Sequence, residues 1–173
     1  PTSRLNCTAA KDVTNIDGNT LPDNLNDVNG EHNGENYVAY TFYLKNTGEE
    51  SCSYRYSIVI SKMTAGIDAA VRVRVYYTPF YYDSDYGGAY VDYAKPKTGG
   101  NGAPEIDPDG RVMTNFYSGN TVLSDQTDGF KAGDISKITV VIWLEGDDAD
   151  CNDDALGGQF KADMSFAVVG GTE

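Results

Sequence analysis

The chain has 173 residues, which is enough for one domain with a full core, and its 40% hydrophobic content argues against a disordered segment. Its 26 acidic residues against 13 Lys and Arg give a formal charge of −13, which would repel phosphate backbones and anionic lipid surfaces. We therefore expect no nucleic-acid partner. We also expect no membrane insertion, because no apolar run approaches the roughly 20 residues of a spanning helix.

Residues 1–36 form a polar segment rich in Asn, Asp and Gly, and little of it is expected to be buried in a core. We interpret this segment as an N-terminal arm with loops, and residues 37–173 as a β-sandwich domain. The scattered apolar residues of the segment are Leu5, Val13, Ile16, Leu21, Leu25 and Val28.

Alternating apolar and polar residues predict strands, because successive side chains of a strand point to opposite faces of a sheet. Val38, Tyr40, Phe42 and Leu44 share one face of the first such segment. In a later one, Arg72 and Arg74 are expected to point to solvent or to a carboxylate on a neighbouring strand. The predicted strands span residues 37–46, 52–61, 71–77, 111–117, 121–123, 138–144 and 159–169.

A tyrosine-rich segment covers residues 76–93 and is interrupted by Pro79, Gly87 and Gly88. Tyrosine rings suit stacking on sugars, and they equally suit core packing or a subunit contact. Both interpretations stay open here. A loop rich in Gly and Pro follows over residues 95–110.

The acidic segment 145–154, EGDDADCNDD, holds six carboxylates, which repel one another unless a cation or backbone N–H groups compensate. Oxygen ligands in a flexible loop suit Ca²⁺, although this spacing departs from the EF-hand pattern. The alternative is a solvated turn capped by Asp150. The candidate calcium ligands are Glu145, Asp147, Asp148, Asp150 and Asp153.

Turn signals recur about every 8–12 residues and no long amphipathic helix is visible, as in sandwich folds. We predict an all-β chain, a jelly-roll-like β-sandwich with short helical turns in its loops. The lone His32 and the absence of nucleophile or metalloprotease motifs argue against an enzyme. We expect no catalytic residues and no required cofactor, with calcium as an optional ligand.

Three segments carry a family pattern: YVAYTFYLKNTGEESCSYRYSIVI at 37–60, AAVRVRVYY at 69–77, and residues 130–166 with W-L-E-G-x-D-x-x-C at Trp143–Cys151. Together they resemble the TasA/camelysin family of exported biofilm-matrix fibre subunits. The resemblance implies a jelly-roll sandwich that polymerises by donor-strand exchange, in which an N-terminal strand of one subunit completes the sheet of the next. It covers residues 37–77 and 130–169, a little under half of the chain, and leaves out residues 1–36 and the tyrosine-rich middle.

The leading hypothesis is therefore a structural subunit of an extracellular filament, whose partners are copies of itself arranged head to tail. An arm with few apolar residues can fill the groove of a neighbour. The chain starts at Pro1 rather than at Met, which we interpret as a processed, secreted protein, although trimming in the cytosol gives the same start. The runner-up is a calcium-dependent carbohydrate-binding or adhesin module with glycans as partners. The donor-strand candidates are Leu5, Cys7, Val13 and Ile16.

The three cysteines, Cys7, Cys52 and Cys151, are an odd number. In a secreted protein this indicates one disulfide and a remaining thiol, or a bond between chains. Cys7 of one chain can meet Cys52 of the next if the arm lies beside the strand that begins at Cys52. An intrachain Cys52–Cys151 bond and three buried thiols are the alternatives.

Overall fold

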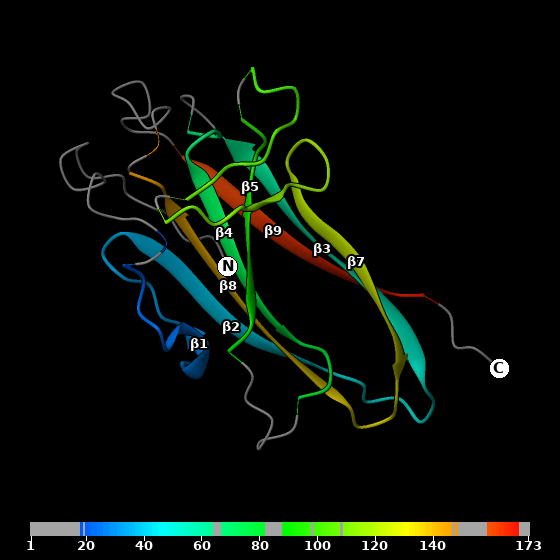
Figure 1. The fold of residues 1–173 in the computed structure, drawn as a ribbon. Helices are drawn as coiled ribbons and strands as arrows, with labels where there is room; N and C mark the ends of the chain where they lie inside the picture. The colour runs from blue at the N-terminus through cyan, green and yellow to red at the C-terminus, as the bar shows by residue number, and fades with distance from the viewer. Residues whose placement is uncertain are drawn as a thin grey trace.

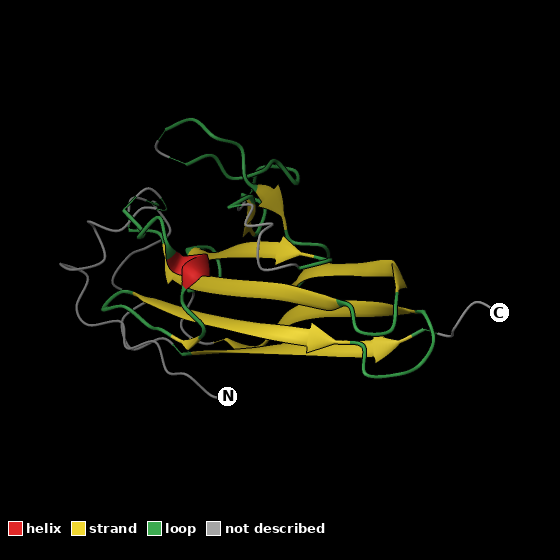
Figure 2. Cartoon of the chain, turned by 90° about the horizontal axis from the view of Figure 1, so that it is seen from below, coloured by secondary structure: helices red, strands yellow, loops and turns green. Residues whose placement is uncertain are grey.

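The computed structural model describes residues 18, 20–63, 67–81, 88–97, 99–107, 109–146, 148 and 159–169. These residues form two packed β-sheets and one short 3-10 turn, η1 (Leu25–Asp27), so the predicted all-β sandwich is confirmed. The long strands run lengthwise through the domain, with loops at both ends (Figures 1 and 2). No helix in this part of the chain has the length and apolarity needed to cross a membrane.

The two sheets differ in width, with six strands in one and three in the other. All neighbouring strands are antiparallel except β5 and β6. The wider sheet has the order β1 (Gly30–Glu31), β2 (Tyr37–Lys45), β8 (Ile135–Leu144), β4 (Val71–Thr78), β5 (Tyr90–Ala94) and β6 (Thr114–Asn115). The narrower sheet has the order β7 (Thr121–Phe130), β3 (Cys52–Met63) and β9 (Phe160–Val168).

The main core lies between the sheets and comes from the alternating residues that predicted these strands. Ile58 of β3, Val73 of β4 and Ile138 of β8 are each at most 1% exposed. Tyr54 extends this core with a polar contact, since its hydroxyl lies 2.7 Å from the Tyr77 hydroxyl and 2.6 Å from Ser136 Oγ. Buried hydroxyls are thus paired with one another, as a low-dielectric interior requires.

A second core lies on the outer face of the wider sheet, where Leu21 and Leu25 pack against Trp143, which is fully buried. The expectation that little of residues 1–36 is buried is therefore wrong for this part of the segment. Leu21 and Leu25 lack strand periodicity, and they are buried because Trp143 presents a large apolar surface that they can cover. The folded body accordingly begins before residue 37.

The two arginines of β4 are buried and paired with carboxylates. Of the two alternatives, solvent or a carboxylate on a neighbouring strand, the second is confirmed for Arg74, whereas the partner of Arg72 lies outside the strands. Arg74 makes two hydrogen bonds of 2.7 and 2.9 Å to Asp92 on β5. Its guanidinium also lies 3.8 Å from the centroid of the Tyr90 ring. Arg72 forms an ion pair with Asp148. Pairing offsets the cost of removing these charges from water.

A candidate assembly groove between β2 and β9

The narrower sheet covers β2 of the wider sheet only in part, through contacts with β9 such as that of Phe42 with Phe166. Val38, Tyr40 and Phe42 of β2 point into the sandwich, yet they are only partly covered, and Tyr40 is 38% exposed. The neighbouring Ile138 of β8 points the same way and is fully buried. Inward-facing apolar residues therefore remain accessible on one flank of the sandwich.

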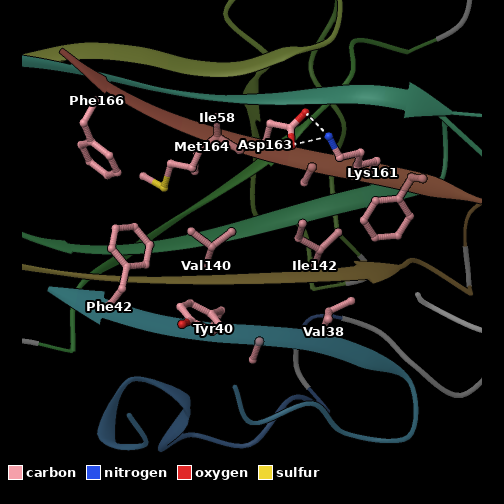
Figure 3. Close-up of a pocket in the computed structure, with 13 residues that line it drawn as sticks. Val38, Tyr40, Phe42, Ile58, Val140, Ile142, Lys161, Asp163, Met164 and Phe166 are labelled. Atoms are coloured by element: carbon pink, nitrogen blue, oxygen red, sulfur yellow. Dashed lines mark hydrogen bonds and ion pairs between the residues drawn. The ribbon is translucent and has the colours of Figure 1, made fainter. Parts of the chain in front are cut away.

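This flank is a groove of about 360 Å³ between β2 and β9, and Figure 3 shows its two walls. Phe42 points from β2 toward Met164 and Phe166 of β9, and Tyr40 and Val38 follow along the same wall, Val38 on the side of Lys161 (Figure 3). Val140 and Ile142 of β8 form the floor between them (Figure 3). The remaining lining residues are Ala39, Ile58, Phe160, Lys161, Ala162 and Asp163. The groove is thus long, mostly apolar and open to solvent along one side.

The backbone of β9 has one open edge, because among the described residues β9 pairs with β3 alone. The amide of Val169 donates to the carbonyl of Ser53, at 2.8 Å, and the amide of Ile60 on β3 donates away from β9, to Asn120. Paired residues in an antiparallel ladder alternate between facing the partner and facing away. The amides and carbonyls of Ala162, Met164 and Phe166 therefore face the open edge.

The same residues of β9 thus supply both the apolar wall and a row of backbone groups that no strand of the described ranges pairs. This arrangement is what a missing strand leaves behind: a row of donors and acceptors beside pockets for alternate side chains. The alternation of residues 159–169 predicts that Phe160, Ala162, Met164, Phe166 and Val168 face inward; the first four line the groove, whereas the prediction is wrong for Val168, which is 73% exposed at the end of the strand. It did not indicate that they line an open groove rather than a closed core.

The opposite edge of the narrower sheet, β7, is built differently. Its inward-facing Val122 and Phe130 are at most 2% exposed, so no apolar groove lies beside it. Its pairing with β3 contains register shifts, and it carries the exposed carboxylates of Asp125 and Asp128, of which Asp125 lies opposite Tyr56 and accepts a hydrogen bond of 3.3 Å from its hydroxyl. Bulges and charges are the usual devices that keep an edge strand from pairing with another chain. Of the two edges, β9 is the one that borders accessible apolar side chains.

The solvent-facing side of β9 is polar. Lys161 and Asp163 form an ion pair of 2.8 Å on that side. The hydrogen bond from Lys161 is the main cause that lowers the pKa of Asp163. Ser165 follows in the same row and lies 2.8 Å from Ser57 Oγ on β3. β9 therefore has one polar, solvent-facing side and one apolar side that lines the groove. Its open backbone edge lies between the two.

The predicted donor-strand residues Leu5, Cys7, Val13 and Ile16 lie outside the described residues, and so does Cys151. Cys52 is described as a free, half-buried thiol at the start of β3. From Tyr54 onward β3 has β7 on one side and β9 on the other, which leaves no free side for an arm there. Cys52 lies outside the pairing with β9, and the disulfide pairing stays a prediction.

Two of the five candidate calcium ligands are described, and each already has a protein partner. Glu145 is buried at the end of β8 and accepts a hydrogen bond of 3.2 Å from Trp143 Nε1. Asp148 pairs with the Arg72 guanidinium, which places a positive charge where a cation would otherwise be favoured. Asp147, Asp150 and Asp153 lie outside the described residues, so calcium binding stays a prediction.

The described part of the tyrosine-rich segment is largely engaged in packing. Tyr76 is 5% exposed, and Tyr77 is hydrogen-bonded inside the sandwich. One face of the Tyr90 ring is covered by the Arg74 guanidinium. Residues 82–87 lie outside the description. These contacts favour the packing interpretation for Tyr76, Tyr77 and Tyr90.

Comparison of the chain with protein-family models, curated proteins and solved structures found no match.

Proposed function

We propose that this chain is the structural subunit of an extracellular filament, in which the N-terminal arm of one copy occupies the β2–β9 groove of the next. The supporting observation is the coincidence at β9: its open backbone edge borders the uncovered apolar residues of β2. An added strand would extend the narrower sheet to four strands and cover β2. The resemblance of residues 37–77 and 130–166 to secreted matrix-fibre subunits agrees with this assignment.

The energetics favour a strand over a small ligand. Covering half-buried aromatic side chains removes apolar surface from water, at about 25 cal/mol per Å². A strand also pairs the amides and carbonyls of Ala162, Met164 and Phe166, which a compact hydrophobic molecule would leave unsatisfied. Main-chain pairing and alternate side chains in pockets are the two components of strand addition. A head-to-tail contact of this kind propagates without closing.

Two alanines on β9 provide a matched test. Ala162 lines the groove, whereas Ala167 is exposed on the opposite face. We expect Ala162→Glu to abolish filaments in negative-stain images, because it places a charge among apolar side chains. We expect Ala167→Glu to assemble normally. Equal filament yield from both variants would exclude this groove as the contact.

A second test removes the arm. Deletion of residues 2–16 should leave a monomer with an unchanged melting temperature that forms no filaments. Filaments of normal width from the deleted protein would refute the donor role of the arm. A glycan-binding screen on the same monomer examines the carbohydrate-binding alternative, which predicts binding that depends on calcium.

A further inference from the structure

The arm contains a segment with the alternation of a strand. From Leu5 to Val13 every second residue is apolar except Lys11: Leu5, Cys7, Ala9 and Val13 share one face of an extended chain. The residues between them are Asn6, Thr8, Ala10 and Asp12. The segment is nine residues long, the same length as β9. Ile16 lies on the other face of this pattern.

The groove sets requirements on such a segment. The β9 positions that line it are Phe160, Ala162, Met164 and Phe166, four alternate positions spanning about 20 Å of strand. A strand on this edge must place apolar side chains opposite most of them. A lysine in the same row is tolerated only at one end, because its ammonium group must reach water.

The two ends of the groove differ in polarity. Toward the Phe160 end the groove is lined by Lys161 and Asp163, whose partly exposed side chains form an ion pair of 2.8 Å. At the other end Phe166 packs on Phe42, with ring centroids 5.6 Å apart, and Tyr54 lies 6.4 Å from the Phe166 ring. A lysine is therefore tolerated at the Phe160 end, where charged side chains already reach water, and disfavoured at the aromatic end.

We propose that residues 5–11 of a second copy pair antiparallel with β9, with Cys7 opposite Met164. This register places Leu5 opposite Phe166 and Lys11 beside Phe160. It rests on the proposed function and adds the direction and register of the donor strand. A parallel strand that begins with Leu5 at Phe160 would instead put Lys11 at the aromatic end. Antiparallel ladders are also slightly more stable per residue.

The native Cys7 makes the register measurable. Directly paired residues in an antiparallel ladder have Cα atoms about 4.5–5.5 Å apart, within the range of about 4.4–6.8 Å that a disulfide needs. In the full chain, Cys52→Ser and Cys151→Ser leave Cys7 as the sole cysteine. Single cysteines are then added as F160C, A162C, M164C or F166C, and S165C serves as the control on the solvent face. Filaments of each variant are oxidised mildly and separated by non-reducing electrophoresis.

We expect the strongest interchain ladder from M164C and none from S165C. A strongest ladder at A162C, F166C or F160C would overturn the register while leaving strand exchange through this groove intact. Oxidised monomers that run as a single faster band would show that each arm occupies its own groove, which contradicts a second copy. Filaments without a ladder at any of the four positions would refute both the register and the proposed assembly.

A reciprocal pair covers the case in which M164C does not assemble. Leu5→Cys combined with Phe166→Cys, in a chain that also carries Cys7→Ser, probes the same register at the other end of the groove. A ladder from this pair supports the proposal. If filaments of this variant form but show no interchain ladder after oxidation, the result contradicts the proposed register.

Discussion

Phe166 on β9 meets Phe42 on β2 edge to face, with ring centroids 5.6 Å apart, across the space between the two sheets. This pair closes one end of the groove and fixes the spacing of its walls there. Aromatic pairs of this kind contribute about 0.5–1.5 kcal/mol beyond their burial. Both rings are only half-buried, so part of the stabilisation available from them is not used by the isolated subunit.

Phe166 should therefore contribute less to the monomer than a closed-core phenylalanine. Phe130 is 2% exposed and serves as the comparison. We expect Phe130→Ala to lower the free energy of unfolding by about 3–5 kcal/mol, and Phe166→Ala by roughly half as much. Urea unfolding of the monomeric protein measures both. Equal losses would mean that the Phe166 ring is fully covered in the monomer, contrary to an open groove.

Proline substitutions on β9 test the direction of the backbone groups. The amide of Met164 faces the open edge, so Met164→Pro removes no bond from the monomer and should leave its melting temperature nearly unchanged. It should still prevent assembly, because the amide that an added strand needs is absent. The amide of Ser165 faces β3, so Ser165→Pro should cost at least about 1–3 kcal/mol of stability. If Met164→Pro lowered the melting temperature more than Ser165→Pro, the assignment of which amides face the open edge and which face β3 would be reversed.

Alkaline pH should destabilise the domain through Tyr56. Burial, followed by the nearby Tyr77 and Asp125, raises the pKa of Tyr56 above its ordinary value near 10. The folded state thus favours the neutral phenol, whose contribution is complete below pH 10 and is lost as the pH rises above it. We expect the free energy of unfolding to fall above about pH 10, and less steeply in Tyr56→Phe. Tyr117→Phe, at an exposed position, should match the unmodified protein, and identical slopes for both variants would contradict the assignment.

Calcium should raise the melting temperature if the acidic segment 145–154 binds it. A ligand specific to the folded state adds about 2.7 kcal/mol at a hundredfold excess over its Kd. Melting curves in EGTA and in excess Ca²⁺ measure this, with Mg²⁺ at equal ionic strength as the control for general screening of the negative charge. Superimposable curves would refute the site. Asp148→Asn should lower stability in EGTA as well, because it leaves the Arg72 charge without its carboxylate.

Periodicity predicted most of the long strands well, because an alternating row such as Val38, Tyr40 and Phe42 specifies which side chains share a face. The exception is β7, which was predicted over 121–123 and spans Thr121–Phe130, because its polar residues hide the alternation. It does not specify whether another strand covers that face. Ile138 and Ile142 show the same alternation as the β2 row and are nearly fully buried, while the β2 row is not. The groove could therefore not be predicted from the strand pattern, since it depends on how many strands each sheet contains.

Isolated residues were harder to predict than rows of residues. Leu21 and Leu25 sit in a polar segment without period, and they are buried only because distant Trp143 offers them a surface. For Arg74 the sequence predicted the face of the sheet but not the burial. Its alternation with valines indicated a face opposite the main core, but the second core on that face buries it beside Asp92.

The position of Gly18 determines how a mechanical load would pass into the domain. Its carbonyl accepts a hydrogen bond of 3.1 Å from Arg74, and a side chain at this position would meet the Trp143 ring at 3.1 Å. Arg74 belongs to β4 and Trp143 to β8, the two central strands of the wider sheet. Tension on the preceding residues would thus be shared by interior strands, each held on both sides, instead of peeling an edge strand away one bond at a time.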